Sequence, residues 1–116
     1  MSSDWTKELY GAIDSKDASK FASFLTENSA FTLGNSPSAK GKKNIEETIA
    51  EFFKSIKGID HNITDTKSCD DTFLTRGTVK YTRHDDTQLE VPFCNVMKLD
   101  GEKIREFQIY VNNAEL

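Results

Sequence analysis

The chain has 116 residues, which fits one domain because single hydrophobic cores are commonest at about 100–150 residues. A chain of this length buries roughly two-thirds of its unfolded surface, so it can build a core without disulfides or metals. Its net charge of −4 and isoelectric point near 5.1 argue against a nucleic-acid binder, which usually presents a basic face. We expect a single domain over residues 1–116 and no nucleic-acid partner.

The two cysteines, Cys69 and Cys94, are far apart in the sequence and belong to no Cys-x-x-Cys or Cys/His cluster. This argues against a metal site and leaves a structural disulfide open but unsupported. The first residues, Met-Ser-Ser-Asp-Trp, lack the basic region and apolar run of a secretory signal. No stretch approaches the ~20 apolar residues of a membrane span. We therefore expect a cytoplasmic protein with reduced thiols and no membrane partner.

Two short amphipathic helices are predicted at the start of the chain. In the first, apolar residues recur at steps of four and three. These residues are Trp5, Leu9, Ala12 and Ile13. Asp17 is positioned to cap a second helix. The buried face of that helix is expected to consist of Phe21, Phe24 and Leu25. A brief strand at residues 30–33 and a loop at residues 34–38 follow.

The strongest helical pattern lies between Asn44 and Gly58. Asn44 and Glu47 have the spacing of a capping box, and Gly58 suits the left-handed residue that ends a helix. Apolar residues between them fall at i, i+4, i+7, i+8 and i+11, which places them on a single stripe. The stripe consists of Ile45, Ile49, Phe52, Phe53 and Ile56.

From about His61 onward the hydrophobic period changes to two, which indicates β-strands. Strands are predicted near residues 61–67, 73–83, 89–99 and 103–112. Asp100-Gly101 suits the two central positions of a type I′ hairpin between the last two strands. Helices followed by an antiparallel meander indicate the α+β class rather than alternating β-α-β units.

The last predicted strand divides by parity into two sets of side chains. The apolar set is Phe107, Ile109 and Val111, and the polar and aromatic set is Gln108, Tyr110 and Asn112. A strand facing plain solvent more often carries Lys, Glu or Thr, so the second set suits a pocket wall with hydrogen-bonding tips. The alternative is that one set packs in the core while the other forms a mildly polar surface or a dimer face.

Asn95 shares one face of the preceding strand with Phe93 and Met97. An amide buried among apolar side chains needs a hydrogen-bond partner. Backbone, water or a ligand can supply that partner. We therefore place Asn95 and Phe93 among the candidate ligand contacts.

Four stretches of the second half carry a resemblance to a known family. They are Gly58-Ile59-Asp60-His61, residues 76–83, Val91-Pro92-Phe93 and residues 100–111. Together with the helical first half, they resemble the SnoaL-like branch of the nuclear transport factor 2-like (ketosteroid-isomerase-like) proteins. The resemblance covers essentially the whole chain.

This resemblance implies an α+β conical barrel, with N-terminal helices packed against a curved antiparallel sheet that leaves an apolar pocket. It also implies a homodimer, since dimers through the outer face of the sheet are common in such proteins. Members include isomerases, polyketide cyclases, epoxide hydrolases and dehydratases beside non-catalytic binding domains. The fold therefore does not determine which of these reactions a member catalyses, or whether it is a catalyst at all.

The cyclase-like members commonly carry an Asp late in the last strand, in a Tyr-x-Asp arrangement. This chain has Tyr110-Val111-Asn112 there. An Asp in an apolar pocket can act as a general acid or base, whereas an amide can only donate and accept hydrogen bonds. The chain therefore differs from these cyclase-like members at Asn112, the position of the residue that would transfer the proton.

His61 is the remaining candidate for acid–base work, because histidine changes charge near neutral pH. A structural histidine bonded to neighbouring backbone is the alternative. Tyr10, Tyr81 and Tyr110 are each candidates to donate a hydrogen bond to a developing oxyanion, or to serve as core aromatics.

The sequence leaves two classes of function open. The first is a domain with an apolar pocket that binds a small apolar molecule, with cofactor-independent isomerase, cyclase or hydrolase activity as a further hypothesis. Its candidate catalytic residues are His61, Tyr110 and Asn112, and its candidate ligand contacts are Asn95, Gln108, Phe93, Tyr81 and Phe53. The second is a non-catalytic dimeric ligand-binding or protein-interaction domain, which accounts directly for the missing carboxylate. Neither class calls for a metal or a cofactor.

Overall fold

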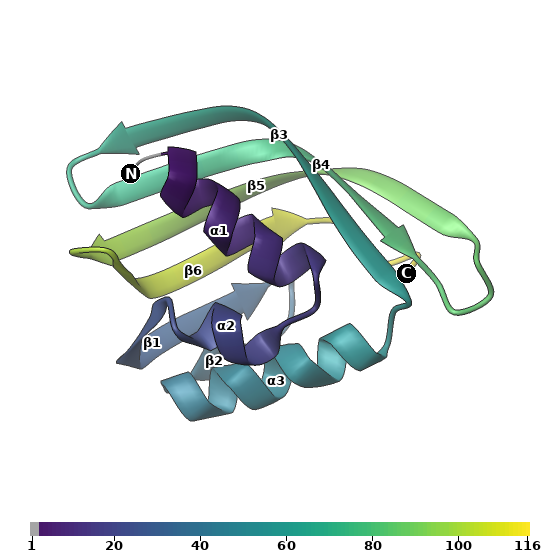
Figure 1. Ribbon diagram of the computed structural model, residues 1–116, viewed down its shortest axis with the longest axis horizontal. Coiled ribbons are helices and arrows are strands. Elements are labelled where there is room, and N and C mark those ends of the chain that lie inside the picture. Colours follow the sequence, from purple (N-terminus) through teal and green to yellow (C-terminus); the bar gives the residue numbers. More distant parts are fainter. Residues whose placement is uncertain (1–2) are drawn as a thin grey trace.

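The computed structural model describes residues 3–116, so Met1 and Ser2 of the N-terminal segment lie outside the described residues. In the described part, three helices pack against one six-stranded sheet (Figure 1). The elements in chain order are α1 (Ser3–Asp14), α2 (Ala18–Ala22), β1 (Leu25–Leu33), β2 (Ala39–Lys40), α3 (Lys42–Lys54), β3 (Gly58–Cys69), β4 (Thr72–Thr82), β5 (Gln88–Asp100) and β6 (Lys103–Val111). None of the helices between residues 3 and 116 is long and apolar enough to span a bilayer.

The sheet has the strand order β2-β1-β6-β5-β4-β3. Strands β3 to β6 form the expected antiparallel meander, while β1 runs parallel to β6 and antiparallel to β2. The sheet curves around the helices, and its edge strands β2 and β3 do not pair across the described residues (Figure 1). The predicted α+β class is confirmed, as an open cone rather than a closed barrel.

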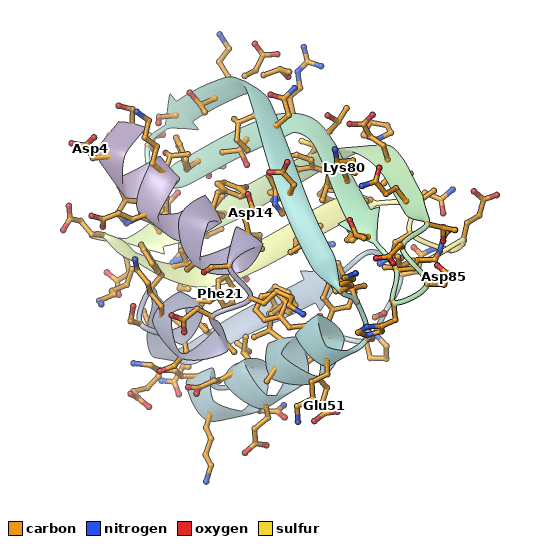
Figure 2. All side chains as sticks on the ribbon, turned by 45° about the vertical axis from the view of Figure 1, so that its right-hand side comes forward. Asp4, Asp14, Phe21, Glu51, Lys80 and Asp85 are labelled. Atoms are coloured by element: carbon orange, nitrogen blue, oxygen red, sulfur yellow. The ribbon has the colours of Figure 1, made fainter. Side chains whose placement is uncertain are left out.

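The hydrophobic core lies between the three helices and the concave face of the sheet (Figure 1). Phe21 on α2 points into this space (Figure 2). Its ring centroid lies 6.0 Å from that of Phe31 on β1 and 5.8 Å from that of Phe107 on β6. Aromatic contacts of this kind join the helices to the centre of the sheet.

The predicted stripe of α1 is confirmed, and that of α3 is confirmed for Ile45, Ile49 and Phe53. Phe52 is only half-buried, and Ile56 is buried but lies beyond the end of the helix. Asp17 caps α2 as predicted, because its carboxylate accepts a hydrogen bond from the Lys20 backbone N–H at 3.0 Å. The second helix is shorter than predicted. It ends at Ala22, so Phe24 lies in the following turn and Leu25 begins β1, although both remain buried.

Both predicted ends of α3 are wrong. The helix begins at Lys42, so Asn44 and Glu47 lie within it and form no capping box. Gly41 precedes it with φ 91°; its N–H donates to Ser29 on β1, and its carbonyl accepts the first helical bond. Pairing with β1 therefore decides where the helix starts. At the other end the cap is Ser55, and Gly58 opens β3.

The β5–β6 hairpin is shifted by one residue from its predicted position. Asp100 pairs with Lys103, which leaves Gly101 and Glu102 as the loop. Gly101 has φ 63°, and neither Asp100 nor Glu102 has a positive φ. The turn thus resembles type II′, with Gly at its first central position, rather than type I′. Both cysteines are free.

Candidate functional site

A small cavity lies between α3 and the concave face of the sheet. Its volume is about 30 Å³, which holds about one water molecule. Most of its wall is apolar and aromatic. Five residues singled out from the sequence line it: Phe53 on α3, His61 on β3, Tyr81 on β4, and Phe93 and Asn95 on β5. The structure therefore brings these five candidates together.

The three polar residues at the end of the chain lie elsewhere. The cavity wall takes the alternate residues Phe107, Ile109 and Val111. Gln108 and Tyr110 face the outer side of the sheet, and Tyr110 is 59% exposed. Asn112 follows the end of β6, is exposed, and accepts a hydrogen bond from the Ala114 N–H at 3.2 Å. The prediction that Gln108, Tyr110 and Asn112 form the pocket wall is wrong.

The reason for this correction is the side on which the helices pack. Helices α1 to α3 cover the face that carries Phe107, since burying that face removes the most apolar surface from water. Gln108 and Tyr110 then face outward on the uncovered side. The alternative drawn from the sequence, one set in the core and the other on a mildly polar surface, describes β6 correctly.

His61 on β3 is held by Asp14, the last residue of α1. Its Nδ1 lies 2.6 Å from Oδ1 of Asp14, and its backbone N–H donates to Oδ2 at 3.1 Å. The carboxylate accepts from Nδ1, so Nε2 of the neutral ring is the acceptor. The ring partner is a carboxylate and not the neighbouring backbone that we considered as the structural alternative.

The His61–Asp14 pair lies at the boundary between the interior and the surface. The His61 side chain is 9% exposed and that of Asp14 is 26% exposed. The imidazole packs against Tyr10 and Phe93, with ring centroids 4.9 Å and 5.1 Å away. Both members of the pair also line an open groove between α1 and β3, and Figure 2 shows Asp14 at the end of α1 beside β3. A proton on His61 therefore has a route to solvent through Asp14.

A buried polar network adjoins the histidine. Oη of Tyr10 lies 2.5 Å from Oγ1 of Thr75 and accepts a hydrogen bond from Nδ2 of Asn95 at 2.8 Å. Oδ1 of Asn95 is buried and has no hydrogen-bond partner among the described residues. This network leaves one acceptor unsatisfied at the cavity wall.

Burial keeps two phenols of this region protonated. It raises the pKa of Tyr10 to about 12, against the opposing effect of its hydrogen bonds with Thr75 and Asn95. It also raises the pKa of Tyr81 to about 12. Both side chains are therefore neutral hydrogen-bonding groups at neutral pH.

The family model described as a SnoaL-like domain matches residues 6–107 of this chain. The chain belongs to the SnoaL-like family. No curated protein matches it. The resemblance read from the sequence is thus confirmed at the level of the family.

Solved structures match this SnoaL-like domain over nearly its whole length. A protein of ketosteroid isomerase-like fold from Catenulispora acidiphila, in complex with trimethylamine, has a TM-score of 0.86 at 14% identity, over 95% of this chain and 86% of that chain. A proposed SnoaL-like polyketide cyclase from Shewanella denitrificans has a TM-score of 0.83 at 11% identity, over 97% and 90%. An LEH-like epoxide hydrolase from M. tuberculosis has a TM-score of 0.81 at 13% identity, over 94% and 80%. At these identities the likeness shows the fold.

Asp14 and Thr75 are the site residues that sequence reasoning missed. Asp14 ends α1, where the negative end of the helix dipole disfavours a carboxylate. A carboxylate at this unfavourable position was a sign that Asp14 interacts with a residue outside the helix. Thr75 gave no sign, because Thr is common in strands.

In the described part of this SnoaL-like domain, no group of three or more His, Cys, Asp or Glu side chains is placed to hold a metal ion. An imidazole oriented by a carboxylate can accept a proton, and the buried amide can accept a hydrogen bond.

Proposed function

We propose that this SnoaL-like domain binds a compact, largely apolar molecule in the cavity and transfers a proton on it through His61, without a cofactor. The observation that carries the proposal is the imidazole held by Asp14 at the wall of an otherwise apolar cavity. Sites for small molecules usually combine apolar walls with a few convergent polar groups. Proteins of the same fold are described as a proposed SnoaL-like polyketide cyclase and an LEH-like epoxide hydrolase, which supports small-molecule chemistry.

The size of the cavity restricts the ligand. A volume of about 30 Å³ is far below the roughly 300–1,000 Å³ of pockets that take drug-sized ligands. Leu33 and Phe52, both half-buried, line this cavity and also a second space of about 200 Å³ between α3 and the β1–β2 loop. We propose that a rotation of the Phe52 side chain joins the two spaces. We therefore propose entry past α3 and a ligand no larger than the joined volume.

The proposed chemistry assigns one role to each member of the pair. Asp14 accepts the hydrogen bond from Nδ1 and fixes the ring, so Nε2 takes the proton from the bound molecule. The carboxylate then stabilises the imidazolium that forms. Phe93, packed against the ring, excludes water and strengthens this electrostatic interaction.

The test uses cyclohexanone as a compact probe with exchangeable protons next to its carbonyl. We expect the wild-type protein to accelerate exchange of these protons in D₂O, followed by NMR. His61→Gln should reduce the acceleration by about 100-fold or more, since general base catalysis contributes about 10²–10⁴-fold. Asp14→Asn should reduce it less, because the ring remains present but loses its orientation.

The matched control is His84→Gln. His84 lies on the exposed turn between β4 and β5, where its Nε2 contacts the Lys54 carbonyl at 2.8 Å. Because this position is away from the cavity, the substitution should leave the exchange rate unchanged. An equal loss in the His61 and His84 variants would contradict the mechanism. Failure of the wild-type protein to bind the probe saturably, measured by thermal shift, would contradict the site itself.

One observation favours the non-catalytic alternative. Asn112 replaces the carboxylate that the resemblance leads one to expect, and it lies outside the cavity. A domain that only binds its ligand needs no such carboxylate. Saturable binding of cyclohexanone with no acceleration of exchange would select this alternative.

A further inference from the structure

Asn95 is buried in the centre of the sheet, with 1% of its surface exposed. Its Nδ2 donates to Tyr10, while its Oδ1 has no partner within residues 3–116. A buried acceptor left unpaired is destabilising, so it calls for a donor from outside the chain.

The neighbours of Asn95 explain why the chain supplies no donor. Across the strands it is paired with Thr75 on β4 and Ile109 on β6. The hydroxyl of Thr75 is within hydrogen-bond distance of Tyr10, and Ile109 has no polar atom. Phe93 and Met97, two residues away on the same face of β5, are apolar and buried.

Two acceptor atoms at the cavity wall are therefore free to receive a hydrogen bond from a ligand. One N–H of the Asn95 amide donates to Tyr10, and Nδ1 of His61 is used by Asp14. Oδ1 of Asn95 and, in the neutral ring, Nε2 of His61 remain as acceptors, while the hydroxyl of Tyr81 at the same wall can donate as well as accept. The two acceptors attract an O–H or N–H group, whereas a ketone or ether leaves the buried Oδ1 of Asn95 unpaired.

We propose that Asn95 Oδ1 selects ligands that carry a hydrogen-bond donor, so that the natural ligand is a compact apolar alcohol or amine. The inference rests on the proposed function, since it assumes that the cavity admits a small molecule. Tyr10 holds the amide plane from the opposite side, which fixes the direction in which Oδ1 accepts. Asn95 is thus the specificity-determining residue of the site.

The test compares cyclohexanol with cyclohexanone, which have similar shapes and differ in having a donor. Affinities are measured by isothermal titration calorimetry. For the wild-type protein we expect cyclohexanol to bind about tenfold more tightly, the value of one well-made hydrogen bond. Asn95→Leu should bring the two affinities to within about twofold, because it keeps the volume and removes the acceptor. Asn62→Leu, at an exposed position of β3, should keep the wild-type ratio.

Two results overturn the inference and leave the proposed function standing: equal wild-type affinities, or a preference that survives Asn95→Leu. The absence of saturable binding of either probe overturns both.

A second measurement uses the wild-type protein and needs no variant to fold. The side-chain carbonyl carbon of Asn95, labelled with ¹³C, should shift downfield as cyclohexanol saturates the site and stay in place with cyclohexanone. A resonance that is unmoved by both probes would assign Oδ1 to bound water only and would overturn the inference.

Discussion

Lys16 adopts a left-handed backbone conformation, with φ 57°, in the turn that joins α1 to α2. Its ammonium group donates to the carbonyls of Phe53 at 3.2 Å and Ile56 at 2.9 Å. These carbonyls lie at and just beyond the end of α3, where backbone acceptors lack helical partners and a cation suits the helix dipole. A single side chain thus ties the first turn to the helix that carries Phe53 of the cavity wall.

We predict that Lys16→Met lowers the free energy of unfolding by about 1–2 kcal/mol, because it keeps the aliphatic stem and removes both hydrogen bonds. Urea unfolding followed by circular dichroism measures this. Lys20→Met, on the exposed side of α2, is the control and should change stability by less than about 0.5 kcal/mol. Equal losses in the two variants would show that the contacts to α3 contribute nothing.

The pairing of β3 with β4 contains the irregularity that shapes the site. Its register shifts between Ile63 and Asp65, opposite Gly77. A Cβ added at Gly77 would collide with the carbonyl oxygen of Asn62 and lie 2.9 Å from its carbonyl carbon. Only Gly permits this close approach of two backbones. The bulge bends β3 two residues beyond His61, the residue that contacts Asp14.

We predict that Gly77→Ala lowers the free energy of unfolding by about 1–3 kcal/mol, because the clash is with backbone that cannot rotate away. It should also shift the NMR resonances of His61 by displacing β3. Gly11→Ala is the matched control: no atom lies within 4 Å of its added Cβ, and Ala favours the helix by up to about 1 kcal/mol. Wild-type stability of the Gly77 variant would refute the close approach.

Across the whole molecule, buried phenols couple stability to alkaline pH. The pKa of both Tyr10 and Tyr81 is raised to about 12 in the folded state, from an ordinary value of 10.0. Between these values the unfolded chain loses protons that the folded chain keeps, so unfolding becomes more favourable as pH rises. The contribution is complete below pH 10 and is lost as pH rises through about 12.

We therefore predict that the free energy of unfolding falls between about pH 10 and pH 12 and that Tyr81→Phe makes this fall shallower. Urea unfolding at a series of pH values gives the slope for each protein. The exposed Tyr110 provides the control, since Tyr110→Phe should leave the slope unchanged. A slope that is the same in all three proteins would contradict a buried, neutral Tyr81.

Association with a second copy and a cytoplasmic location both stay predictions. The helices leave the outer face of the sheet uncovered (Figure 1). Tyr110 on β6 is exposed. Sedimentation velocity measures whether this face pairs two copies in solution.

Local features of the sequence determined the order of the helices and of the longer strands, the α+β class and five of the cavity residues, but not the two-residue strand β2. Period-two and period-3.6 patterns depend only on near neighbours, so they identify strands and helices directly. His61, Phe93 and Asn95 were recognisable because each stands out within its own strand. The start of α3 was not recognisable from the sequence, because Gly41 is held by a hydrogen bond to Ser29 on β1 rather than by its neighbours in sequence.

Only the tertiary structure decided which face of β6 lines the cavity and what holds His61. Parity separates the two faces of a strand, but the helices that pack on one of them decide which becomes the interior. The contact between Asp14 and His61 joins residues 47 positions apart, across two elements whose approach no local pattern encodes. The sequence thus contained the histidine, and the packing of α1 against β3 gave it an orienting carboxylate.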